Sequence, residues 1–282
     1  MIYLKSYCYS DHELPFIIAN LTESYDHIDK FYLYEYNRTH TGLNKKYNLQ
    51  KYMDIIPLNL KDKLVYRMID VSNICEYAYE NEGLIHSHNE PIQRSYFYYD
   101  PEVPVLNNND IIIDIDVDEI IYDKSYPKLI SDIRKSNRPM SIKLNQFFFK
   151  NNYLWTNCSF SSPSIYLYSM VKNRQHKLRG IPIKNCRDLS YKTDGICGAH
   201  MSWIMPTSYM VKKLHCYSHP KYRKYADYKK LNEAIRNKVY IFAENRKFDI
   251  DELSYTDDRI PRYLQNDTIF DFIEDNANIQ NL

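Results

Sequence analysis

The spacing of hydrophobic and polar positions predicts that the chain opens with a strand, a helix and a second strand. Residues 2–9 are apolar and β-favouring, and residues 28–34 form a second β-rich run. Between them, apolar side chains recur at helical spacing behind Asp11, which can cap a helix: Leu14, Ile17, Ile18 and Leu21. This order predicts a parallel βαβ unit. Ligands of such sheets bind at the carboxyl ends of the strands, where the polar run 35–42 falls.

The strongest strand pattern lies in the middle of the chain, at 110–121 (DIIIDIDVDEII). Its consecutive β-branched residues predict a buried central strand, with a turn near Asp118. If the strand continues, alternation places Asp114, Asp116 and Asp118 on one side of it. We expect the remaining segments to be a helical and loop-rich stretch at 44–100, a helix at 126–135 capped by Ser125, an aromatic β-like run at 145–157, a long loop region at 160–200 and a helix at 206–218.

Composition then excludes several classes of protein. The 282 residues carry 37 Lys+Arg against 36 Asp+Glu, a balance that argues against a protein that wraps nucleic acid. The 5 glycines form no GxGxxG or GxxxxGK loop, so a glycine-rich phosphate cradle is excluded. With scattered cysteines, no signal peptide and no long apolar run, we expect a cytoplasmic protein without a membrane span, in a bacterium or a virus-infected host cell. The 29 tyrosines fit either an AT-rich genome or a sugar-binding surface.

The acidic end of the central strand carries the most informative chemistry. Carboxylates crowded at 114–119 repel one another unless a cation lies among them, and hard divalent cations prefer such oxygen ligands. Two enzyme classes use this element. A haloacid-dehalogenase-like phosphatase would use Asp114 and Asp116 in a DxDxV string, although that string normally closes the first strand of its domain. A nucleotide-sugar glycosyltransferase places a DxD motif in mid-chain, as here.

Several blocks in order resemble glycosyltransferase family seventeen, which contains the N-acetylglucosaminyltransferases that make bisecting GlcNAc. Residues 116–120 (DVDEI) resemble the acidic motif of that family. The other similar blocks are His27–Glu35 with Thr39–Gly42, Gln93-Arg94, Gly198–Trp203, Lys213–His219 and Ile260–Leu264. Ala199 stands where the family has tryptophan, and 44–90 has no obvious counterpart. These departures leave the acceptor and the donor sugar open.

The resemblance implies one α/β domain of the GT-A type over residues 1–266, a Rossmann-like nucleotide-sugar-binding sandwich with a central mixed sheet. An acidic tail would follow at 267–282. The resemblance also implies an inverting transfer of a GlcNAc-like sugar from a UDP-sugar to a glycan or glycoprotein acceptor. Mn²⁺ or Mg²⁺ would neutralise the departing diphosphate. Neither nucleic acid nor a membrane is an expected partner.

The same resemblance implies roles for particular residues. Asp118 would bind the metal, Asp116 the metal or the ribose, and His219 would be a further metal ligand. His200 would be the base that deprotonates the acceptor. The donor would contact further side chains, with the arginines on its diphosphate or on the acceptor: Glu35, Asn37, Thr41, Arg94 and Arg179.

Three alternatives to these roles stay open from the sequence. Glu35 would otherwise be a buried anchor for the 37–42 loop. Each of His200 and His219 would otherwise be a hydrogen-bonded histidine in or near the core. The whole chain would otherwise be the phosphatase described above, or a catalytically inactive glycan-binding protein of the same fold.

Overall fold

The computed structural model describes residues 1–73, 82–172, 191–216, 220–242 and 247–271. In this part of the chain the strands form two mixed sheets, one of seven strands and one of five. The sequence predicted an α/β fold with one central mixed sheet. The α/β class is confirmed, and the second sheet is the difference.

The first sheet is built on the predicted βαβ unit. β1 (Ile2–Cys8) and β2 (Lys30–Tyr36) pair in parallel and are joined by α1 (Leu14–Ser24), which follows a single 3-10 turn at Asp11–Glu13. The strand order is β10-β6-β9-β4-β1-β2-β3. The other strands are β3 (Leu64–Ile69), β4 (Ile111–Asp114), β6 (Met140–Ser141), β9 (Ser164–Leu167) and β10 (Tyr191–Lys192).

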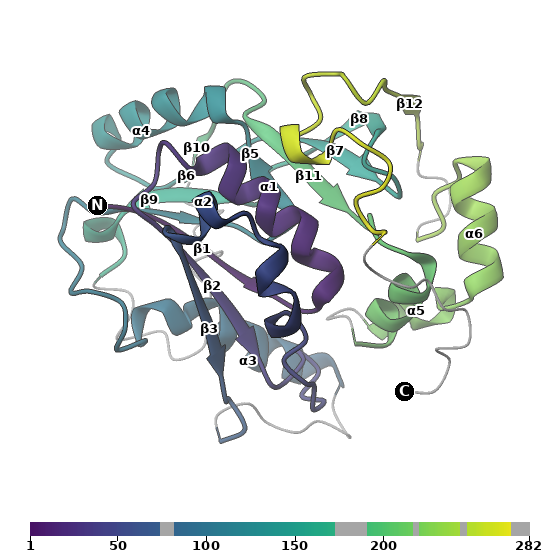
Figure 1. Cartoon of the computed structure of the whole chain (residues 1–282), viewed down its shortest axis with the longest axis horizontal. Coiled ribbons are helices and arrows are strands. Elements are labelled where there is room, and N and C mark those ends of the chain that lie inside the picture. Colours follow the sequence, from purple (N-terminus) through teal and green to yellow (C-terminus); the bar gives the residue numbers. More distant parts are fainter. Residues whose placement is uncertain (74–81, 173–190, 217–219, 243–246, 272–282) are drawn as a thin grey trace.

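The second sheet has the order β12-β8-β7-β11-β5. It contains β5 (Glu119–Ile121), β7 (Leu144–Phe148), β8 (Tyr153–Phe160), β11 (Gly198–Ser202) and β12 (Ile250–Glu252). β7 and β8 form an antiparallel hairpin within the aromatic run that the sequence singled out. α5 (Thr207–Cys216) and α6 (Tyr228–Asn237) pack beside this sheet through Met210, Leu214 and Leu231 (Figure 1).

Helix α1 connects the two sheets. Its side chains at Leu14, Ile17 and Ile18 join the core over β1 and β2, whereas Phe16 and Ala19 join the core over the second sheet. Figure 1 shows α1 lying in front of the first sheet and extending toward the second. Helix α4 (Tyr126–Lys135) has the predicted bounds and shares the first-sheet core with α1. α1 therefore holds the two sheets in a fixed relation.

The opposite face of the first sheet is rich in tyrosine. Tyr3, Tyr32, Tyr34 and Tyr36 are buried there, and α3 (Glu82–Ser95) with the following 3-10 turn at Tyr96–Tyr98 covers them. Tyrosine suits this layer because its ring packs as a hydrophobe while its hydroxyl finds a partner at the margin. These tyrosines serve the core and do not form a sugar-binding surface.

Candidate active site

The strand order reverses between β1 and β4. β2 and β3 follow on one side of β1, and the chain then returns to place β4 on the other side, parallel to β1. In open α/β sheets, ligands bind in the crevice outside the carboxyl ends of the strands at such a switch point. Here that position lies between residues 9–13, after β1, and residues 115–118, after β4. We call these two segments, with the side chains that reach them, the carboxyl edge.

The acidic residues after β4 form a turn rather than a longer strand. Glu119 N–H donates to Asp116 O (2.9 Å), and Asp116 N–H donates to the Glu119 carboxylate (2.7 Å). Ile115 and Val117 are buried in the core, and Asn20 of α1 holds the Val117 carbonyl at 2.8 Å. The apolar side chains of the turn therefore anchor it. Asp116 and Asp118 are half-buried at the carboxyl edge.

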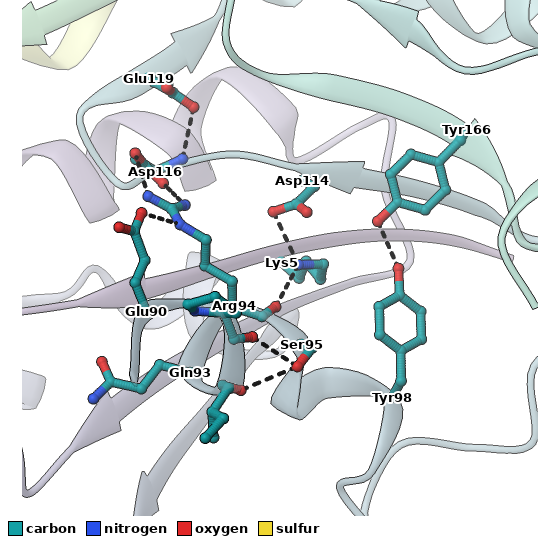
Figure 2. A network of polar contacts seen from close by, with 12 residues as sticks. Lys5, Glu90, Gln93, Arg94, Ser95, Tyr98, Asp114, Asp116, Glu119 and Tyr166 are labelled. Carbon is teal, nitrogen blue, oxygen red and sulfur yellow. Dashed lines mark hydrogen bonds and ion pairs between the residues drawn. The ribbon is translucent and has the colours of Figure 1, made fainter. Parts of the chain in front are cut away.

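Arg94 and Asp116, both predicted to contact the sugar donor, form an ion pair with each other (Figure 2). The Arg94 guanidinium contacts both Asp116 oxygens, with Nη2 at 3.2 Å, and its Nε donates to Glu90 at 2.7 Å. It also lies over the Tyr7 ring, 4.7 Å from the centroid. Burial would lower the pKa of Arg94, but Asp116 with Tyr7 and Glu90 outweighs that effect and holds the pKa well above its ordinary value. Arg94 is therefore a permanent cation at the carboxyl edge.

A second buried cation neutralises Asp114. Lys5 Nζ lies 2.9 Å from Asp114 and donates to the Arg94 carbonyl at 3.0 Å, with both side chains buried (Figure 2). From the sequence we expected a cation among the crowded carboxylates. Lys5 is that cation for Asp114, and Arg94 for Asp116. A nucleophilic Asp114, as the phosphatase alternative requires, would have to leave this buried ion pair. That alternative has no support in the structure.

Glu35 lies at the end of β2 with no exposed surface. Its carboxylate accepts hydrogen bonds from the Asn48 N–H (2.7 Å), the Leu49 N–H (3.2 Å), Lys45 Nζ (3.1 Å) and the Tyr66 hydroxyl. All these donors belong to the protein. In this structure Glu35 anchors the segment 45–49, not the 37–42 loop of the alternative interpretation. A buried carboxylate is retained where hydrogen bonds compensate it, as these do. A contact of Glu35 with the sugar donor stays a prediction.

The loop after β2 contacts α3 at Asn89 and Gln93, close to Arg94 on the same helix. Gln93 Nε2 donates to the Arg38 carbonyl (3.1 Å), and Asn89 donates to the His40 carbonyl (3.2 Å). Asn37 bonds to Asp70, Ser72 and the Val71 N–H beyond β3, and the hydroxyl of Thr41 lies 2.8 Å from that of Thr39. Contacts of Asn37 and Thr41 with a donor stay a prediction.

The second sheet brings His200 to Asp118. His200 pairs with Glu119 across β5 and β11, and the Met201 N–H donates to the Asp118 carbonyl at 2.7 Å. As a result, His200 Nε2 lies 3.8 Å from Asp118 Oδ2, with side chains that are 12% and 16% exposed. His200 Nδ1 lies 2.9 Å from Gln146 Oε1 on β7. Two residues that the sequence predicted for chemistry, 82 positions apart in the numbering, are thus neighbours.

Among the described residues, Asp118 and His200 could contribute ligands to a divalent metal. No group of three or more His, Cys, Asp and Glu side chains in the described part of the chain could hold an ion. Metals that bind nucleotide phosphates often take only one or two protein carboxylates and complete their shell with phosphate oxygens and water. One carboxylate and one imidazole meet that need. Asp116 does not fit equally well, because Arg94 contacts both of its oxygens.

The residues after β1 were not among the predicted site residues. Glu13 is buried and accepts hydrogen bonds from the backbone N–H groups of Tyr9 and Ser10. Burial raises its pKa to about 7; Lys213 opposes the shift and Asp118 adds to it. The polar run SDHE directly after the first strand, at a switch point, was the signal in the sequence. A carboxyl group that titrates near neutral pH therefore belongs to the carboxyl edge.

Two predicted site residues, Arg179 and His219, lie outside the described residues, as does most of the predicted acidic tail. Their roles stay predictions.

The model of glycosyltransferase family 17 matches residues 8–273. A search of curated proteins gave no match. Among solved structures, one similar chain is a Bacillus anthracis protein assigned as a glucose-1-phosphate thymidylyltransferase, in complex with sucrose. It is 9% identical, the alignment covers 80% of this chain and 95% of that one, and the TM-score is 0.40.

The helices of the fold are short or carry many polar side chains. In the described part of the chain, none combines the length and the apolar character needed to cross a bilayer.

Proposed function

The chain belongs to glycosyltransferase family 17 and is a transferase, as its sequence predicted, and from this premise we propose that it moves a sugar from a UDP-sugar to a glycan acceptor. We infer a GlcNAc-like donor sugar, a metal-dependent reaction and a GT-A type of fold. The observation that supports this proposal is the meeting of Asp118 and His200 at the switch point between β1 and β4. Ligands of open α/β sheets bind at that position.

The protein contributes fixed charge and fixed donors. Asp118 and one further side chain would hold a divalent cation, which when bound would neutralise the diphosphate of the donor and the charge that develops as it leaves. Arg94 supplies a guanidinium that matches phosphate oxygens in a bidentate manner. In this structure the guanidinium is bonded to Asp116 and Glu90. To contact a phosphate of the UDP-sugar, Arg94 would have to bond to these carboxylates and to the phosphate at the same time.

An inverting transfer also needs a base for the acceptor hydroxyl. The base removes the proton while the hydroxyl oxygen attacks the anomeric carbon on the face opposite to the leaving diphosphate. His200 is the residue that the sequence predicts for this role. Glu13 is a second group at the carboxyl edge, and a pKa of about 7 suits a base at neutral pH.

The experiment that tests the proposal is NMR of a panel of UDP-sugars incubated with the protein and Mg²⁺, which is diamagnetic. We expect release of UDP from at least one donor, with a first-formed product of opposite anomeric configuration. Asp118→Ala should lower the rate about 100-fold, as loss of a group that stabilises developing charge commonly does, whereas Asp132→Ala on α4 should not. Product of retained configuration would contradict the inverting mechanism. Equal rates for the wild type and Asp118→Ala would contradict the site.

A further inference from the structure

The ring of His200 is held on three sides by elements of the second sheet and the turn after β4. Gln146 lies beside it in register, because β7 and β11 are parallel and pair these two positions. Phe160 at the end of β8 stacks on the ring, with centroids 3.8 Å apart and an interplanar angle of 29°. Asp118 lies on the remaining edge, opposite Gln146. The orientation of the imidazole is therefore fixed before any ligand binds.

The contact with Gln146 also sets which ring nitrogen carries the proton. Gln146 Nε2 donates to the Phe147 carbonyl at 2.8 Å, so its other amide atom, Oε1, is the oxygen and faces His200. That oxygen can only accept, and it lies 2.9 Å from His200 Nδ1. Nδ1 must then be the donor. In the neutral ring the lone pair is on Nε2, the nitrogen that faces Asp118.

When the ring is neutral, the lone pair on Nε2 faces a carboxylate oxygen at 3.8 Å. A second proton on the ring, or a metal ion that both atoms contact, would relieve their repulsion. The distance is too long for a hydrogen bond. It is shorter than the roughly 4.2 Å that two ligands on opposite sides of one ion span, at about 2.1 Å each. One cation can therefore contact both atoms without the two lying on opposite sides of it.

We propose that His200 is a nitrogen ligand of the divalent metal, together with Asp118, and that Gln146 is the positioning residue that presents Nε2 to it. This inference rests on the proposed metal-dependent transfer. Metal-bound histidines regularly donate their other N–H to a carbonyl or carboxylate, which fixes the tautomer. One consequence is that His200 cannot also take the acceptor proton through Nε2, so the base must be another group.

A second His–Asp pair, His27 with Asp123, has a shorter separation than His200 with Asp118. His27 Nε2 lies 2.6 Å from Asp123 Oδ1, so a proton lies between these two atoms. There is no lone pair facing the carboxylate and no room for an ion. His27 is remote from the carboxyl edge, since it precedes β2 and stacks on Tyr126 at the start of α4. His27→Ala is thus a matched control for His200→Ala.

The test uses Mn²⁺ added to the full chain after treatment with EDTA. Pulsed EPR should show coupling of the bound Mn²⁺ to a ¹⁴N nucleus, and the coupling should disappear in His200→Ala and persist in His27→Ala. Gln146→Leu should weaken Mn²⁺ binding by roughly 10–100-fold, as is usual for residues that orient a ligand. Gln146→Glu, which keeps an acceptor for Nδ1–H, should retain the affinity of the wild type.

Three results would overturn the inference. They are bound Mn²⁺ without nitrogen coupling, coupling that survives in folded His200→Ala, and Mn²⁺ affinity that is the same in Gln146→Leu as in the wild type. If His200→Ala does not fold, the two Gln146 variants decide the question. Donor turnover with Mn²⁺ but without nitrogen coupling would leave the proposed function standing and reject only the role of His200. Absence of Mn²⁺ binding with and without UDP-sugar would reject both.

Discussion

At the scale of single residues, buried cations of the protein neutralise some carboxylates of the carboxyl edge and leave one without such a cation. Lys5 pairs with Asp114, and Arg94 pairs with Asp116 and Glu90. Asp118 lies outside these pairs and faces an imidazole across 3.8 Å. Crowded carboxylates are costly unless opposite charge lies nearby. The protein thus fixes most of the acidic motif as structure and leaves Asp118 as the residue suited to an external cation.

The pair between Arg94 and Asp116 should be measurable as a coupling energy. In a double-mutant cycle with alanine, we expect the free energy of unfolding to show coupling on the order of 1–3 kcal/mol, because Arg94 is almost fully buried and is contacted by both oxygens. The exposed pair of Lys128 and Asp132 on α4 is the control and should give only about 0.3–0.5 kcal/mol. Coupling no larger than in the control would show that the pair does not hold the edge.

The buried Glu13 predicts a particular dependence of stability on pH. Its pKa is raised from 4.5 to about 7, so between these values the folded protein holds a proton that the unfolded chain releases. The free energy of unfolding should therefore fall as pH rises through this window, by at most about 1.4 kcal/mol per pH unit from this group. Above about pH 7 the contribution becomes constant.

Urea unfolding in EDTA at several pH values checks this prediction. Glu13→Gln should give a flatter profile than the wild type, because the amide does not titrate. Glu233→Gln, at an exposed position on α6, should keep the wild-type slope. A wild-type slope in Glu13→Gln would show that this carboxyl is ionised throughout the window.

At the scale of elements, the position of His200 depends on the close approach of β11 to β5. A Cβ on Gly198 would lie 2.1 Å from the Ile120 carbonyl oxygen and 2.9 Å from Ile121 Cα, both backbone atoms. Gly198→Ala should therefore push the strands apart. The cost should be about 1–3 kcal/mol or more in unfolding free energy, together with weaker Mn²⁺ binding through the displaced His200.

Gly195 offers the matched comparison, because a Cβ there would meet nothing within 4 Å. Gly195→Ala should leave both unfolding and metal binding close to the wild type. The two variants can be compared by urea unfolding and by titration with Mn²⁺. Equal behaviour of both would mean that β5 and β11 do not need the close approach.

The elements that the sequence predicted are those with a strong local pattern. The βαβ unit and the helix at 126–135 are confirmed, since their apolar residues recur at the period of the structure they form. β3 was missed because it is an edge strand with mostly half-buried side chains, so its sequence LVYRMI shows no alternation. β9 and β11 were read as loop because they are only four and five residues long, and their partners lie far away in the sequence.

For the carboxyl edge, the sequence located the acidic turn but not its partners. The residues Asp116, Asp118, Arg94 and His200 come from blocks that resemble the family. That Lys5 neutralises Asp114, or that Gln146 orients His200, follows only from strand register between distant segments. Local patterns carry no information on such pairing, because register is set by the assembled sheet.

At the scale of the whole molecule, the two sheets together make the carboxyl edge. The first sheet supplies the switch point and the turn after β4, and the second sheet supplies His200 and Gln146. Helix α3 adds Arg94. Helix α1 packs against both and holds the turn through Asn20. Ligand binding at this edge should therefore stabilise the whole described fold rather than one part of it.

The most direct test of a metal-dependent UDP-sugar site at the carboxyl edge is the thermal stability of the protein with Mn²⁺ and a panel of UDP-sugars. A ligand present at a hundred times its Kd stabilises the folded state by about 2.7 kcal/mol. We predict that Tm rises when Mn²⁺ and a suitable UDP-sugar are both present, and that Asp118→Ala abolishes the rise while Asp132→Ala retains it. A UDP-sugar site at the carboxyl edge is contradicted if no UDP-sugar raises Tm with Mn²⁺ or Mg²⁺, or if Asp118→Ala responds like the wild type.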